Sequence, residues 1–134
     1  MVAQAVRPPG DTLKLDKGAA QELAAGVSAL NAGDLEAAQQ RLEMALGFDP
    51  AAHQIHFQLG VVHGKRGRVF EAIASFERAL SLAPRLFAAV RSLAMLYQKA
   101  GFANKAKEMW ERSLILAPDE PTRESIREHL RRLG

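Results

Sequence analysis

The residues best suited to do chemistry are three histidines in one short stretch of the chain. His53 and His56 are one helical turn apart, which is a spacing at which two imidazoles can share a metal ion, and His63 follows them. No Asp or Glu lies nearby on the same predicted helix to complete a ligand set. The pattern therefore favours histidines that pack as flat side chains, and we predict neither a metal nor another cofactor.

The remaining reactive residue types form no catalytic pattern. Serines and carboxylates are scattered, and the sequence contains neither a phosphate-cradling glycine loop nor a recognisable nucleophile motif. Cysteine is absent, which excludes disulfides and thiolate metal sites. We therefore expect a protein without enzymatic activity.

Arginines recur every four residues near the C-terminus, at Arg123, Arg127 and Arg131. Such a basic face can dock on an acidic partner or an anionic lipid headgroup. It is equally typical of a solvated helix face with intrahelical ion pairs such as Glu128 with Arg132, which is the interpretation we favour. The chain has 18 Lys and Arg against 15 Asp and Glu, with the signs interspersed, and this disfavours nucleic-acid binding. We expect His129 to be exposed on the same helix.

The length of 134 residues and the hydrophobic content of 48% suit one domain with a real core. Residues 1–17 include Pro8-Pro9-Gly10 and read as a flexible N-terminal lead-in. No apolar run suits a signal peptide or a membrane span, so we predict a cytoplasmic protein.

Prolines and glycines divide the rest of the chain at a fixed interval. Pro50, Pro84 and Pro118 are 34 residues apart, and Gly33, Gly67 and Gly101 keep the same interval. Between them, apolar and small residues return every three or four positions, as on the buried face of a helix. The pattern predicts three antiparallel helix pairs, at residues 19–31 with 35–48, 53–65 with 69–82, and 87–99 with 103–116.

Small residues recur at matching positions of these pairs, where they let two helix axes approach closely. The first helices carry Gly26, Gly60 and Ala94 in one row, and the second helices carry Ala38, Ala72 and Ala106 in another. Residues 121–133 lack these rows but place Ile126, Leu130 and Leu133 on one stripe. We predict that this last segment is a capping helix rather than a fourth repeat.

These features resemble the tetratricopeptide repeat (TPR) family, whose unit is a helix–turn–helix of 34 residues ending in proline. The resemblance implies an all-α, right-handed α-solenoid of three repeats plus a C-terminal capping helix. It implies a TPR domain at 18–134, with repeats at about 19–52, 53–86 and 87–120 and the cap at about 121–133. His56 and His63 stand where the family favours packing aromatics, which agrees with a packing role.

The resemblance also implies a binding site, because the first helices of such repeats line a concave groove that usually binds peptides. The matching positions in this chain are Leu23, Val27, Leu30, Asn31, Phe57, Gln58, Val61, Lys65, Arg91, Ser92, Met95, Gln98 and Lys99. The first half of this set is apolar, and Lys65, Arg91 and Lys99 make the other half basic. It suits an amphipathic helix or extended segment with apolar anchors and acidic flanks, with Phe57 as the central anchor.

Some relatives hold the C-terminal carboxylate of chaperones through a clamp of lysines, arginine and asparagines. The matching positions here are Leu23, Val27, Gln58, Ala88 and Ser92, so that clamp is absent. We therefore predict a protein–protein interaction scaffold whose partner is a protein or peptide. The alternatives are a dimeric TPR chaperone for a secreted or assembly-bound protein, or an anionic-surface or nucleic-acid binder through the basic face. Self-association, or coverage of the groove by the lead-in through Leu13 and Leu15, is a further alternative.

Overall fold

The computed structural model describes residues 15–134, and these form seven helices without a strand. Leu13 and most of the predicted lead-in lie outside the described residues. The all-α prediction is confirmed, and each helix bound lies within two residues of its predicted position. The helices are α1 (Lys17–Asn31), α2 (Leu35–Phe48), α3 (His53–Lys65), α4 (Val69–Leu82), α5 (Phe87–Ala100), α6 (Ala103–Leu116) and α7 (Glu120–Leu133).

The helix ends follow from local chemistry. Three helices begin after an aspartate whose carboxylate accepts a hydrogen bond from a free backbone N–H, at Asp16, Asp34 and Asp119. The turns inside the pairs use Gly33, Gly67 and Gly101, with φ of 85°, 77° and 89°. Only glycine adopts this left-handed backbone without strain, so the repeated glycine ends the first helix of each pair.

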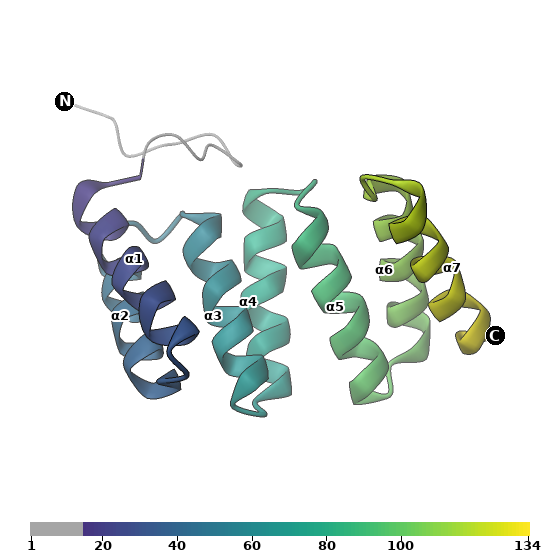
Figure 1. The fold of residues 1–134 in the computed structure, drawn as a ribbon, viewed down its shortest axis with the longest axis horizontal. Coiled ribbons are helices and arrows are strands. Elements are labelled where there is room, and N and C mark those ends of the chain that lie inside the picture. Colours follow the sequence, from purple (N-terminus) through teal and green to yellow (C-terminus); the bar gives the residue numbers. More distant parts are fainter. Residues whose placement is uncertain (1–14) are drawn as a thin grey trace. The chain divides into compact units, whose positions relative to one another are not determined.

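The chain divides into two compact units, one extending to Pro84 and the other from Arg85 to Gly134. The first unit contains α1 to α4, in which α1 packs on α2, α2 on α3 and α3 on α4. The helices α1 and α3 also touch each other, and Figure 1 shows both in front of their partners α2 and α4. This unit therefore presents its two first helices on one side.

Glycines on the first helices of this unit allow the close packing that the sequence predicts. A Cβ added at Gly26 would lie 2.7 Å from the Leu42 side chain, and one at Gly60 would lie 2.8 Å from the Phe76 ring. Leu42 and Phe76 are buried and hold matching positions in successive repeats. Each large side chain therefore fills the space that the absent glycine side chain leaves.

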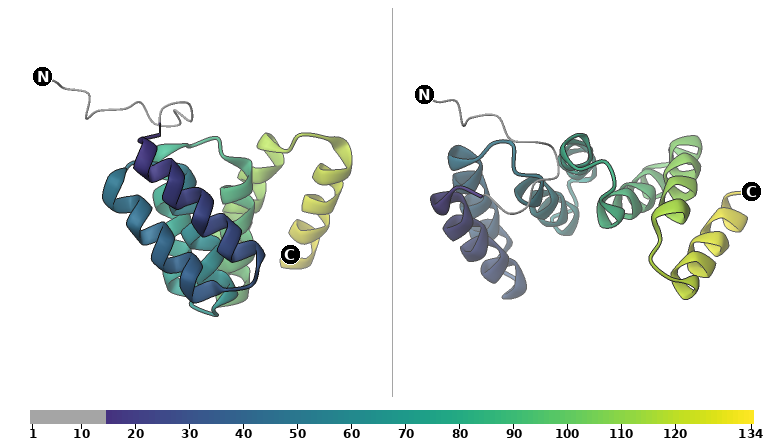
Figure 2. Two further views of the ribbon diagram at one scale, coloured as in Figure 1. Left: turned by 60° about the vertical axis from the view of Figure 1, so that its left-hand side comes forward. Right: turned by 90° about the horizontal axis from the view of Figure 1, so that it is seen from above.

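The second unit contains α5, α6 and α7, with α6 packed against both of its neighbours. Figures 1 and 2 both show α7 running alongside α6. The core of this unit includes Leu93 and Tyr97 from α5, Trp110 from α6 and Ile126 from α7, all of them buried. Ile126 belongs to the predicted stripe, so α7 covers the end of the third helix pair as expected of a cap. Within residues 15–134 no helix is both long enough and apolar enough to cross a bilayer.

Candidate protein-interaction surface

The predicted groove residues of the first unit lie on the side shared by α1 and α3. Asn31 and Lys65 are exposed, whereas the apolar members are half-buried. Leu23 and Leu30 pack partly against the core cluster beneath them, which contains Leu42 and Ile55. Part of each apolar side chain is therefore used to stabilise the unit, and only the remainder faces solvent. The structure places Leu23, Val27, Leu30 and Asn31 on α1 and Phe57, Gln58, Val61 and Lys65 on α3.

Phe57 contacts both the core of the first unit and the solvent. Its ring meets the buried Phe76 edge to face, with the centroids 5.3 Å apart and the planes at 66°. Such a pair adds about 0.5–1.5 kcal/mol beyond the area it buries. Phe57 is nevertheless only half-buried. A substitution there will therefore change both the packing of α3 on α4 and the exposed surface.

The predicted groove residues of the second unit lie on α5. Arg91, Met95 and Lys99 are exposed, and Met95 is 49% exposed. Gln98 has a structural role that the sequence did not reveal, because its Oε1 accepts a hydrogen bond of 3.0 Å from Trp110 Nε1. That bond links α5 to α6 and fixes the indole ring.

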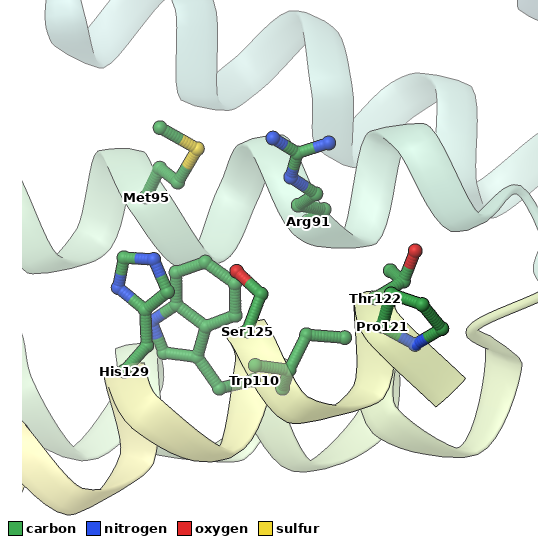
Figure 3. Close-up of a pocket in the computed structure, with 8 residues that line it drawn as sticks. Arg91, Met95, Trp110, Pro121, Thr122, Ser125 and His129 are labelled. Atoms are coloured by element: carbon green, nitrogen blue, oxygen red, sulfur yellow. The ribbon is translucent and has the colours of Figure 1, made fainter. Parts of the chain in front are cut away.

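A cleft of about 320 Å³ opens between α5 and α7 of the second unit. Figure 3 shows Arg91 and Met95 on one wall, with Ser125 and His129 on α7 opposite. The residues that line the cleft are Arg91, Met95, Trp110, Pro121, Thr122, Ser125, Ile126 and His129. Only Arg91 and Met95 were predicted from the sequence as partner-binding residues. The available signal for the others was weak: His129 follows the core residue Ile126 by three positions, which places both on one side of the helix.

The prediction that His129 is exposed was wrong. Its imidazole stacks on the Trp110 indole, with the ring centroids 4.2 Å apart and the planes only 9° from parallel. The Nδ1 atom is buried and has no hydrogen-bond partner among the described residues. Burial lowers the pKa of His129, and the positive charges of Arg132 and Arg91 lower it further. A neutral imidazole suits this position, since a flat uncharged ring can cover the indole face.

The arginines of α7 are paired along their own helix. Arg123 and Arg127 bond to Glu120 at 3.0 and 2.7 Å, and Arg131 bonds to Glu128 at 2.6 Å. The predicted pair between Glu128 and Arg132 also forms, at 3.9 Å. Hydrogen bonds from Arg127 and Arg123 lower the pKa of Glu120, and those from Arg131 lower the pKa of Glu128. These ion pairs form a ladder along α7, and this ladder supports the interpretation of the basic face as a solvated helix surface.

The ladder makes α7 sensitive to acid. A carboxyl whose pKa is lower in the folded state stabilises that state above its ordinary pKa, and the effect is lost as the pH falls through the lowered value. For Glu120 and Glu128 the ordinary value is 4.5, so we expect α7 to lose protection against amide exchange as the pH falls below that value. Hydrogen exchange followed from about pH 6 to pH 3 by NMR measures this, with α2 as the internal reference. Equal changes in α2 and α7, after correction for intrinsic exchange, would contradict the expectation.

The histidines of α3 serve the interior of the first unit. His53 and His63 are buried, and His56 is half-buried with its Nε2 donating a 2.8 Å hydrogen bond to the Pro50 carbonyl. Burial lowers the pKa of His56; the Pro50 bond opposes this shift, whereas the charge of Arg78 adds to it. The histidines of α3 therefore pack, as the sequence analysis favoured.

The known proteins that this chain resembles are helical repeat proteins. A family model described as tetratricopeptide repeat matches residues 23–86. No curated protein sequence matches the chain significantly. Among solved structures, the first TPR of Spaghetti (RPAP3), bound to the HSP90 peptide SRMEEVD, superposes with a TM-score of 0.80 and 16% identity over 90% of this chain and 94% of that one.

Two further structures show the same fold. The translocator chaperone SycD of type III secretion from Yersinia enterocolitica gives a TM-score of 0.78 at 14% identity, over 85% of this chain and 81% of that one. A crystal structure of MamA gives 0.70 at 21% identity and covers 74% of this chain, which spans only 54% of the MamA chain. The family match identifies residues 23–86 as tetratricopeptide repeat, and the same proline and glycine interval continues beyond them to Gly101 and Pro118, as in the tetratricopeptide repeat structures that this chain resembles.

Proposed function

We propose that this protein is a non-enzymatic interaction scaffold that binds a peptide or helical segment of another protein. The observation that carries the proposal is the half-buried apolar surface of α1 and α3, formed by Leu23, Val27, Phe57 and Val61. An apolar surface on two neighbouring helices can receive the apolar side chains of a partner. On α5 of the second unit, Arg91 and Lys99 are exposed and would attract acidic residues of a partner.

The structural neighbours agree with this proposal at a coarse level. One of them was solved with an HSP90 peptide and another is a secretion chaperone, so this fold serves protein recognition in both. The clamp positions here carry Leu23, Val27, Gln58, Ala88 and Ser92, which offer no positive charge to a terminal carboxylate. We therefore propose a partner held by apolar side chains with acidic flanks, rather than a chaperone tail.

The expected affinity is modest. If a partner covers roughly 400 Å² of apolar surface, the gross gain is about 10 kcal/mol at about 25 cal/mol per Å². Association and ordering cost about 4–15 kcal/mol, so a short linear partner should bind with roughly micromolar affinity.

Substitutions on α3 test the proposal. We expect Val61→Lys and Phe57→Glu each to weaken partner capture at least about tenfold, because a charge placed on the apolar surface must be desolvated on binding. Capture from a lysate, quantified by mass spectrometry, measures this. The control is Phe70→Glu, which makes the same change at a side chain that is 69% exposed on α4. Circular dichroism should show that all three variants remain helical.

The contact between Phe57 and Phe76 requires a second variant at that position. Phe57→Leu keeps an apolar side chain on the surface but removes the aromatic pair. If binding is lost only in variants that also lose helicity, Phe57 acts through the core. If partners are retained equally by Val61→Lys and by the wild type, the surface of α1 and α3 is not the binding site.

A further inference from the structure

The cleft between α5 and α7 has an unbalanced charge. Its lining contains Arg91 and His129 but neither Asp nor Glu. Arg91 is exposed and forms no ion pair with any residue from 15 to 134, whereas the arginines 123, 127 and 131 of α7 are all paired with glutamates. The cleft therefore favours an anionic group.

The other lining residues add hydrogen-bonding and apolar contacts. Thr122 and Ser125 bring hydroxyl groups to the lining from α7, as Figure 3 shows. Met95 and Ile126 add apolar side chains to the lining. The volume of about 320 Å³ lies at the lower end of the range for ligand pockets, about 300–1,000 Å³, and has room for one or two amino-acid side chains.

We propose that this cleft binds a carboxylate side chain and an adjacent apolar side chain of a partner peptide, and that protonation of His129 strengthens this binding. The inference rests on the proposed function, because Arg91 is one of the residues assigned to the partner there. It adds the chemistry of the acidic flank and a dependence on pH.

The charges around His129 explain the direction of this dependence. Arg91 faces it from α5, Arg132 and Glu128 lie on α7 itself, and α6 contributes the uncharged face of Trp110. A carboxylate placed between Arg91 and His129 would offset the repulsion between the two cations and could accept a hydrogen bond from the imidazolium. By linkage, if the bound carboxylate favours the proton on His129, the proton favours the carboxylate by the same factor.

The pH range follows from the two titrating groups. Burial lowers the pKa of His129 below its ordinary 6.5. The imidazole is therefore neutral at pH 8 and gains its proton only as the pH falls below 6.5. A glutamate side chain of the peptide remains ionised down to its own pKa of about 4.3. Binding should therefore strengthen on acidification between these limits.

Two capped peptides test the proposal: Ac-Leu-Glu-Phe-Glu-NH₂ and its neutral counterpart Ac-Leu-Gln-Phe-Gln-NH₂. Trp110 is the one tryptophan of the chain, so its indole N–H gives a single NMR signal from the floor of the cleft. We expect the acidic peptide to shift this signal and to bind about tenfold more tightly at about pH 5.5 than at pH 8. The neutral peptide should bind about tenfold more weakly than the acidic one at the lower pH.

Variants separate the two parts of the inference. Arg91→Gln should weaken the acidic peptide about tenfold at both pH values, because it removes the permanent cation from an exposed position. His129→Phe keeps a flat ring against Trp110 but cannot titrate, so the ratio of affinities at the two pH values should fall to about one. His129→Gln should give the same ratio. This second variant controls for an effect of the larger phenylalanine ring on binding.

Several results would overturn the inference. Equal binding of the two peptides would show that the cleft does not recognise the carboxylate. An unchanged ratio of affinities at the two pH values in both His129 variants would show that protonation of His129 does not control binding. Shifts confined to α1 and α3 would leave the proposed function standing but reject the cleft as the site of the acidic residue. No shift of the Trp110 signal at about 5 mM peptide would likewise reject the cleft, since even millimolar affinity would be visible.

Discussion

Trp110→Ala is expected to lower the free energy of unfolding of the second unit by about 3–5 kcal/mol, the usual range for deleting a large buried aromatic. Trp110 is 1% exposed, bonds to Gln98 on α5 and stacks on His129 of α7, so one side chain joins all three helices of this unit. The loss is large compared with the 5–15 kcal/mol that stabilises a typical domain. Urea unfolding followed by circular dichroism measures it, since the variant has no tryptophan to report by fluorescence.

The chain itself supplies a matched control for this substitution. Phe76 holds the position in the second repeat that Trp110 holds in the third, so phenylalanine is already compatible with this packing. Trp110→Phe keeps most of the ring but removes the N–H donor to Gln98, and we expect a loss of only about 1–2 kcal/mol. If Trp110→Ala costs no more than Trp110→Phe, the indole does not hold the unit together.

Gly60→Val is expected to lower the stability of the first unit by about 2–3 kcal/mol. A Cβ at this position would lie 2.8 Å from three atoms of the Phe76 ring, closer than side chains approach one another. Phe76 is 3% exposed and packs against the Phe57 ring, so its own ring has little room to move. The helices α3 and α4 would have to separate, which loses the packing between them.

Gly64→Val is the control, because it makes the same change one turn later on the same helix. A Cβ at Gly64 meets no atom within 4 Å. Since valine has a slightly better helix propensity than glycine, we expect a change of less than about 0.5 kcal/mol, in the stabilising direction. Thermal unfolding of both variants measures the difference, and equal melting temperatures would show that the contact with Phe76 does not limit residue size at position 60.

The fold could be predicted closely because its signals are local. A left-handed glycine such as Gly67 and a proline such as Pro84 act within their own turns, so the helix bounds follow from the sequence without knowledge of the packing. The small residues Gly26 and Gly60 indicated in addition which faces of the helices pack against each other. These patterns recur at a fixed interval, which makes each one a check on the others.

The site could be predicted only in part, because it depends on contacts between helices. Helical periodicity places Phe57 on the outer face of α3, but it does not reveal that the ring also packs against Phe76. Likewise, His129 reads as one polar residue on a charged helix until α7 is packed on α6. The cleft lined by Arg91, Trp110 and His129 arises from the way α7 packs on α6, which the spacing of residues in the sequence does not specify.

The order in which the helices contact one another has a consequence for how the protein folds. Within each unit, the principal contacts join helices that are neighbours along the chain or separated by one helix. Contacts of this kind close only short loops, so little chain entropy is lost before they form. Proteins with such local contacts typically fold in microseconds to milliseconds. Each helix pair can therefore serve as a starting nucleus, and folding can spread to the next pair without waiting for distant parts of the chain to meet.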